Sequence, residues 1–308
     1  MLNLGFVSAI LAENSFEEVI DFAAANQFEC VEIMCWPKGK AERRYAGITH
    51  IDVDNLDEAK IAYIQKYVGN TGISISGLGY YPNPLDADQE KGNYYFAHIK
   101  KVIQSAGKLG LGIVNTFIGA DHTKSISENL KTFAKKWPAI IKFAEDHNVK
   151  IAIENCPMYF TADEWPSGKN LAHTPAIWDE MFSIIPSDNF GLNYDPSHLV
   201  WQQMDEIQPI YDYKDKLFHI HLKDAKVYRN KLNHVGTMAH PLEYHSPKLP
   251  GLGDVNWGDF FSALTSVGYR GPVCIEVEDK AYEKKEEDKF KAILTSRNYL
   301  RQFLGSAY

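Results

Sequence analysis

The 308-residue chain has few cysteines and no long apolar run. None of its four cysteines belongs to a Cys-x-x-Cys pair, and three lie inside apolar segments, which is typical of reduced core residues. No segment has the length of a membrane span, and the apolar N-terminus lacks the basic start and the cleavage site of a signal peptide. The sequence therefore predicts a cytoplasmic protein with no membrane partner.

Positive charge is also scarce. Lysine and arginine number 32 against 40 aspartates and glutamates, so the formal net charge is −8. A protein that binds a phosphate backbone usually gathers basic residues, so nucleic acid is not an expected partner. The 45% of hydrophobic and 13% of aromatic residues exclude a disordered chain, and no linker rich in Pro, Gly or Ser divides it. We therefore expect a single domain over residues 1–308.

No Gly-x-Gly-x-x-Gly motif follows the first apolar run, which weakens a doubly wound open sheet. Instead, eight short apolar runs alternate with longer amphipathic segments, as in a parallel sheet with helical crossovers. This pattern predicts an α/β fold, a (β/α)8 (TIM) barrel, with the open sheet as the alternative. The stretch 228–256 is then an extended loop between the seventh and eighth strands, and roughly 282–304 is a C-terminal helix. The predicted strands lie in the runs 2–10, 29–36, 73–80, 111–119, 150–156, 190–196, 217–224 and 272–279.

The strand runs have two different sides, because alternate residues of a strand point in opposite directions. In five runs one side is wholly apolar and the other carries ionisable or small residues; Ile151 and Ile153, for example, oppose Ala152 and Glu154. The apolar side suits the surrounding helices, so the other side faces the barrel axis. Charges buried there without partners would cost several kcal/mol each, and a divalent cation would compensate them.

Four ionisable residues come one each from the last four strands. They lie late in those strands, toward the end at which such barrels carry their active sites. Three carboxylates and one imidazole form an oxygen-rich donor set that suits Mn²⁺ or Mg²⁺, with Co²⁺ as a further option. The alternative is a set of buried ion pairs, for example Lys223 with a carboxylate. The four residues are Glu154, Asp195, His221 and Glu276.

Five segments, IAIEN, NYDPSH, HIHLKD, GLGDVNW and CIEVE, follow one another in an order that resembles a known family. This is the xylose-isomerase-like (β/α)8 group of sugar isomerases and epimerases, which includes ketose 3-epimerases and inosose-type enzymes. The resemblance implies that Glu154, Asp195, His221 and Glu276 bind one divalent metal ion. It also implies that Glu154 and Glu276 act as acid and base, and that His198 lies beside the substrate.

Together these features predict an isomerase or epimerase of a small sugar or cyclitol, in which one glutamate removes the proton next to a carbonyl and another returns it. Lys223, Glu32 and Trp36 are further candidates for substrate binding. The related ketose epimerases have an arginine a few residues after the histidine of the seventh strand, where this chain has Lys223 and Lys226. Glu32 could bind a sugar hydroxyl or pair with a lysine, and Trp36 could stack on a sugar ring or pack a loop.

These departures leave other functions open. The same site could catalyse β-elimination from a keto-sugar or a 3-keto glycoside, because enolisation is the shared first step. His234, His240 and His245 of the insertion could then assist the leaving group, or be ordinary loop residues. An endonuclease-IV-like enzyme would need several zinc ions and a basic groove, and a non-catalytic sugar-binding protein would not need an intact ligand set. The sequence also leaves open whether the chain forms a homo-oligomer through its outer helices.

Overall fold

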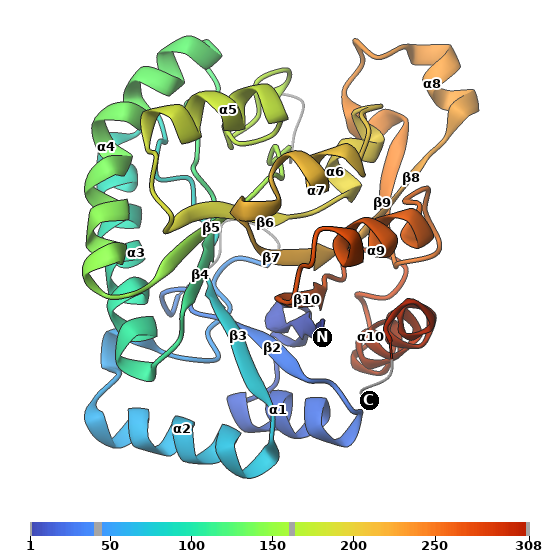
Figure 1. Ribbon diagram of the computed structural model, residues 1–308. Coiled ribbons are helices and arrows are strands. Elements are labelled where there is room, and N and C mark those ends of the chain that lie inside the picture. Colours follow the sequence, from blue (N-terminus) through green and yellow to red (C-terminus); the bar gives the residue numbers. More distant parts are fainter. Residues whose placement is uncertain (1, 40–44, 160–163, 306–308) are drawn as a thin grey trace.

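The computed structural model describes residues 2–39, 45–159 and 164–305 and contains a closed barrel of eight strands. The strands are β1 (Asn3–Val7), β2 (Cys30–Met34), β3 (Ser74–Gly79), β4 (Ile113–Thr116), β5 (Lys150–Glu154), β6 (Phe190–Tyr194), β7 (Leu217–Leu222) and β10 (Pro272–Ile275). All neighbours are parallel, in the order β1-β10-β7-β6-β5-β4-β3-β2 (Figure 1). The predicted (β/α)8 barrel is confirmed. The open sheet is wrong, because β1 pairs with β2 on one side and with β10 on the other.

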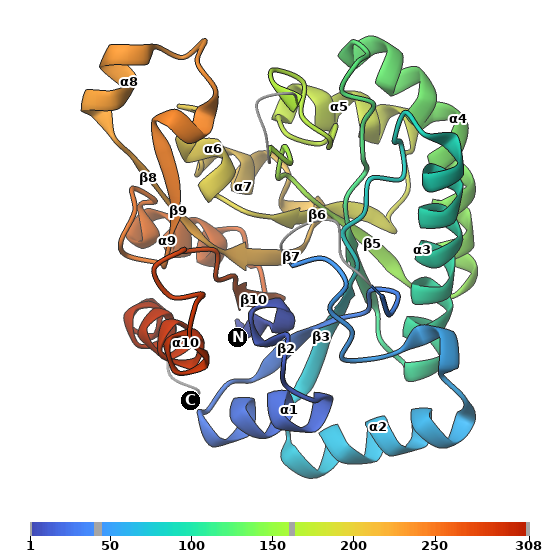
Figure 2. The ribbon, with the colours of Figure 1, turned by 180° about the vertical axis from the view of Figure 1, so that it is seen from behind.

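Helices surround the barrel in both ribbon views (Figures 1 and 2). They are α1 (Phe16–Ala25), α2 (Glu58–Thr71), α3 (Gln89–Leu109), α4 (Ile126–Asp146), α5 (Pro175–Ile184), α6 (Ser197–Trp201), α7 (Gln208–Asp212), α9 (Trp257–Ser266) and α10 (Glu286–Leu300). Helix α1 begins with a capping box in which Ser15 and Glu18 satisfy each other's backbone N–H groups. No helix in these described ranges combines the length and the apolar character needed to cross a membrane.

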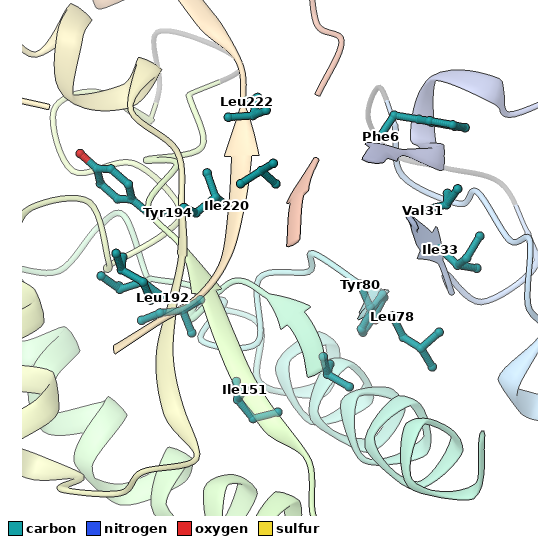
Figure 3. Close-up of a cluster of buried hydrophobic side chains, with 14 of the residues drawn as sticks. Phe6, Val31, Ile33, Leu78, Tyr80, Ile151, Leu192, Tyr194, Ile220 and Leu222 are labelled. Carbon is teal, nitrogen blue, oxygen red and sulfur yellow. The ribbon is translucent and has the colours of Figure 1, made fainter. Parts of the chain in front are cut away.

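The apolar sides of the strands form the main core. Phe6, Ile151, Leu192 and Ile220 are completely buried, and Figure 3 shows such side chains gathered from successive strands. The alternation predicted from the sequence therefore separates two environments. The outer side of the barrel wall stabilises the fold by burying hydrocarbon, which leaves the inner side for polar chemistry.

The insertion after β7 contains secondary structure that the sequence did not indicate. Strands β8 (Asp224–Val227) and β9 (His245–Lys248) form an antiparallel hairpin, and α8 (Arg229–Val235) lies between them. In Figures 1 and 2 the hairpin and α8 extend away from the barrel. A separate small core joins the hairpin to α6; its buried members are Trp201, Ala225, Val227, Leu232 and Tyr244.

Candidate active site and metal centre

The four predicted metal ligands lie together at the carboxyl ends of neighbouring strands. Glu154 ends β5, His221 lies in β7, and Asp195 and Glu276 directly follow β6 and β10. The side chains of Glu154, Asp195 and His221 are at most 3% exposed, and that of Glu276 is 18% exposed. Strand parity therefore predicted that these side chains lie at one end of the barrel, the end that carries the active site in this fold, and their role as metal ligands stays a prediction.

His221 is oriented by groups behind it. Its Nε2 lies 2.7 Å from Glu32 Oε2, and the Tyr81 hydroxyl donates to the other oxygen of Glu32. The opposite ring nitrogen, Nδ1, lies 3.4 Å from Glu276 Oε2 and 3.8 Å from Glu154 Oε2, and has no hydrogen-bond partner among the described residues. A carboxylate that holds one imidazole nitrogen while the other faces oxygen donors is a common arrangement behind metal-binding histidines.

Lys223 lies at the centre of the acidic side chains and is 2% exposed. Its Nζ is 2.6 Å from Glu276 Oε2, 3.0 Å from Asp195 Oδ2, 3.1 Å from Glu278 Oε2 and 3.8 Å from Glu154 Oε1. The buried ion pairs that the sequence offered as the alternative to a metal are therefore present.

The ammonium of Lys223 dominates the electrostatics of this cluster. Burial would raise the pKa of Glu154 and of Glu276, but the ammonium and the nearby imidazoles hold both below their ordinary values. Asp195 is buried so completely that its pKa stays above its ordinary value. Burial would lower the pKa of Lys223, yet the surrounding carboxylates raise it well above the usual range. The cluster thus holds the glutamates ionised, but it also makes them weaker bases, since an efficient catalytic base has a pKa near the working pH.

His198 lies in α6 and points at the same carboxylates. The indole N–H of Trp201 donates to His198 Nδ1 at 3.2 Å, so the neutral ring carries its proton on Nε2. That Nε2 lies 3.3 Å from Asp195 Oδ2 and 3.5 Å from Glu154 Oε1. Behind Trp201 stacks His245 of the insertion, with the ring centroids 4.8 Å apart. The insertion therefore supports His198 indirectly.

Asp224 directly follows Lys223 in the HIHLKD segment. It anchors the GLGDVNW loop (residues 251–257), a function that the sequence did not predict. The aspartate is completely buried, and its carboxylate accepts several hydrogen bonds from the loop. A Cβ added to Gly253 would lie 2.1 Å from Asp224 Oδ1, so only glycine lets the loop approach this closely. The donors are the backbone N–H groups of Gly251, Gly253 and Val255 and the indole N–H of Trp257.

The remaining predicted residues lie in less direct positions. Glu32 is completely buried and is bonded to Tyr81 and His221, and its contact with a sugar stays a prediction. Trp36 is half-buried and packs edge-on against Tyr80, with ring centroids 4.8 Å apart.

The donor atoms fit a metal ion at this place. In the described part of the chain, Asp195 Oδ2 and His221 Nδ1 are buried and make no hydrogen bond, although Asp195 Oδ2 lies within ion-pair distance of Lys223 and His198. The donor atoms of Glu154, His221 and Glu276 lie within 4.8 Å of one another. Two further triads meet the same criterion, Glu154 with Cys156 and His198, and Glu32 with His219 and His221. Oxygen-rich ligands with unsatisfied lone pairs are what a divalent cation requires.

A (β/α)8 barrel with carboxylates and histidines at its catalytic end defines the class of protein. A family model described as xylose isomerase-like TIM barrel matches residues 20–302, so the chain belongs to this family. The resemblance noted in the sequence is therefore confirmed. Inosose dehydratases are among the curated relatives of the chain, and ketose 3-epimerases are among its structural neighbours.

Two curated relatives illustrate the range of sequence similarity. The uncharacterized protein YfiH of Bacillus subtilis (strain 168) is 25% identical over 302 residues, which cover 90% of this chain and 93% of the relative. The inosose dehydratase of Geobacillus thermodenitrificans (strain NG80-2) is 27% identical over 140 residues. This second match covers 45% of this chain and 46% of the dehydratase, less than half of each.

Solved structures extend the likeness over nearly the whole chain. A D-tagatose 3-epimerase-like protein has a TM-score of 0.69 at 20% identity, covering 98% of this chain and 97% of its own. The IolI protein with a bound zinc atom has a TM-score of 0.73 at 16% identity, covering 99% and 100%. At these identities the likeness establishes the fold alone.

Proposed function

We propose that the chain is a divalent-metal-dependent isomerase or epimerase of a sugar or cyclitol, which acts by proton abstraction next to a carbonyl. The observation that carries this proposal is the meeting of Glu154, Glu276 and the unbonded His221 Nδ1 at one point of the barrel. Sugar epimerases among the structural neighbours support the proposal.

The two glutamates are suited to opposite steps of one reaction. In the barrel order, β5 and β10 are separated by β6 and β7, so Glu154 and Glu276 approach the centre from different sides. One carboxylate removes the proton next to the substrate carbonyl, and the other returns a proton to the opposite face. Both pKa values are held below their ordinary values, so each glutamate is ionised at neutral pH and can act as the base, and the glutamate that returns a proton must first take one up.

Glu154, Asp195, His221 and Glu276 would hold the metal ion. A bound divalent cation would polarise the carbonyl and stabilise the negative charge of the enediolate. Three carboxylates favour Mn²⁺ or Mg²⁺, and Co²⁺ also suits the set. The zinc atom bound by the neighbouring IolI structure supports a metal ion in a protein of this fold. His198 Nε2 would donate to a substrate oxygen.

A lyase activity is the second candidate, and the inosose dehydratase relatives favour it. Loss of a group two carbons from a ketone begins with the same proton abstraction. The same glutamate would act as base, while His198 or the second glutamate would protonate the leaving oxygen. The substrate would then be a keto-sugar, an inosose or a 3-keto glycoside.

The experiment is solvent deuterium incorporation, followed by NMR. The protein loaded with Mn²⁺ or Mg²⁺ is incubated in D₂O with ketoses, inososes and 3-keto glucosides. Deuterium next to the carbonyl supports enolisation, and the product distinguishes an epimer from an elimination product. Glu276→Gln should abolish the exchange, whereas Glu287→Gln, on the exposed face of α10, should not. No exchange with any member of the panel would contradict the proposal.

A further inference from the structure

The position of Lys223 bears on how tightly the site can hold a metal. Its ammonium lies within 3.0 Å of Glu276 Oε2 and Asp195 Oδ2, and 3.8 Å from Glu154 Oε1. These are three of the four proposed ligands, and the ammonium occupies the space between them. Two cations cannot use the same carboxylate oxygens at bonding distance, since their mutual repulsion in a buried site is severe.

We propose that Lys223 is an internal competitor for the metal ion, and that Glu278 receives its ammonium when a divalent cation binds. This inference rests on the proposed metal-dependent function. Lys223 would thereby weaken metal binding, while preventing the buried carboxylates from repelling one another when no metal is bound.

Glu278 is suited to this role by its position. It lies two residues after Glu276, on the same side of the chain by strand parity, and its Oε2 is 3.1 Å from Lys223 Nζ. Its side chain is 25% exposed, compared with 3% for Glu154 and none for Asp195. An ammonium that moves toward Glu278 therefore leaves the inner carboxylates, keeps a salt bridge and gains access to water.

The charges of the cluster favour an ammonium that moves to Glu278 when the metal ion binds over one that leaves the cluster. Glu154, Asp195, Glu276 and Glu278 carry four negative charges when all are ionised. With His198 and His221 neutral, the ammonium reduces the net charge to −3, and a divalent cation together with the ammonium reduces it to −1. Retaining Lys223 beside Glu278 thus keeps the metal-bound cluster closest to neutral, and burying an uncompensated charge is costly. The ammonium of Lys223 would then lie beside the partly exposed Glu278, where it could contact an oxygen or a carboxylate of the substrate.

The test measures Mn²⁺ affinity by calorimetry, and thermal unfolding with EDTA or with Mn²⁺. Lys223→Met keeps the length of the side chain and removes its charge. It should bind Mn²⁺ about tenfold more tightly than the wild type and, with EDTA, unfold at a temperature lower by about 5 °C. Lys226→Met is the matched control, since Lys226 pairs with Asp254 outside the site and its loss should change neither quantity.

Glu278→Gln tests the second half of the proposal and leaves the ammonium in place. It should weaken Mn²⁺ binding about threefold in the wild type, but have little effect in the Lys223→Met background, because Glu278 acts through the lysine. Equal weakening in both backgrounds would overturn the role of Glu278.

The other outcomes of the Mn²⁺ measurements distinguish the competition by Lys223 from the proposed metal-dependent function. If Lys223→Met binds Mn²⁺ no more tightly than the wild type, the competition is overturned, even where the wild type binds Mn²⁺ and exchanges deuterium. If only Lys223→Met binds Mn²⁺, the competition is supported and the metal-dependent function of the wild type fails. If neither protein binds a divalent cation, both inferences are overturned.

Discussion

The barrel has two contrasting sides at its catalytic end. The charged side follows β5, β6, β7 and β10 and consists of Glu154, Asp195, His221, Lys223 and Glu276. The apolar side lies mainly at the ends of β1 to β4 and consists of Val7, Met34, Tyr81, Phe117 and Met158. Both are largely buried, so the difference is chemical: the first concentrates charge that must be compensated, while the second packs like a core. A sugar presents both C–H groups and oxygens, so under the proposed function the two sides would meet these two kinds of surface.

The largest effect is expected on the charged side. Glu154→Gln and Glu276→Gln should each lower the turnover rate by about 10²–10⁴-fold, because an amide can neither accept nor return the proton. Circular dichroism should show both variants folded. Steady-state assays with the substrate found by deuterium exchange measure the loss. A variant that keeps more than a tenth of the wild-type rate would exclude that glutamate from proton transfer.

The apolar side should respond in stability. Phe117 is 4% exposed and lies 5.0 Å from Tyr81, edge to face. Phe117→Ala should reduce the free energy of unfolding by about 3–5 kcal/mol, as truncation of a buried aromatic does. Urea unfolding measures the change. Turnover per folded molecule should stay within about tenfold of the wild type; a loss as large as that of Glu276→Gln would show that the two sides do not differ in function.

A substitution of Glu32 tests the boundary between the charged side and the apolar side, because this residue joins Tyr81 to His221. If it orients the imidazole, Glu32→Gln should weaken Mn²⁺ binding by about 10–100-fold. Calorimetry measures the affinity, and Glu29→Gln is the control, because Glu29 is exposed and directly precedes the amino end of β2. An unchanged affinity with a raised KM would instead support the direct sugar contact predicted from the sequence.

The insertion should make the free energy of unfolding depend on pH. Burial lowers the pKa of His245 to about 4, and its Nδ1 donates to the carbonyl of Pro241. The folded pKa lies below the unfolded value of about 6.5, so the unfolded chain binds more protons in between and stability is lost as the pH falls from about 6.5 toward 4. By pH 5 the loss from this residue should be about 2 kcal/mol.

Urea unfolding between pH 7 and pH 5 measures that loss. His245→Phe keeps a ring on Trp201 and removes the titrating group, so its stability should fall less over the same interval. Buried His173, whose pKa is also lowered to about 4, contributes equally in both proteins and cancels in the difference. Parallel curves for the two proteins would contradict the assignment.

Strand alternation was enough to predict which ionisable side chains face the barrel interior. Glu154 and His221 oppose fully apolar neighbours in their own strands, so parity assigned them to the interior. The same rule placed Lys223 on that side but could not show that its ammonium lies among four carboxylates, since this depends on how the ends of four strands, β5, β6, β7 and β10, meet in space. The hairpin of β8 and β9 was missed because its strands are four residues long, largely polar and separated by seventeen residues. Their pairing depends on tertiary contacts with α6.

The smallest expected effect concerns Trp201, which connects the insertion to the charged side. Its spacing from His198, three residues on one helix, is a signal in the sequence that points to this contact. Trp201→Phe removes the indole N–H that fixes the proton of His198 on Nε2, while keeping an aromatic ring against His245. One hydrogen bond of about 1 kcal/mol corresponds to a loss of about fivefold in kcat/KM, with Mn²⁺ affinity unchanged. Trp165→Phe is the matched control, because it loses an indole hydrogen bond to the backbone of Met238 and leaves His198 intact. Equal losses in the two variants would mean that Trp201 acts only through packing, and the insertion would then have no specific influence on the charged side.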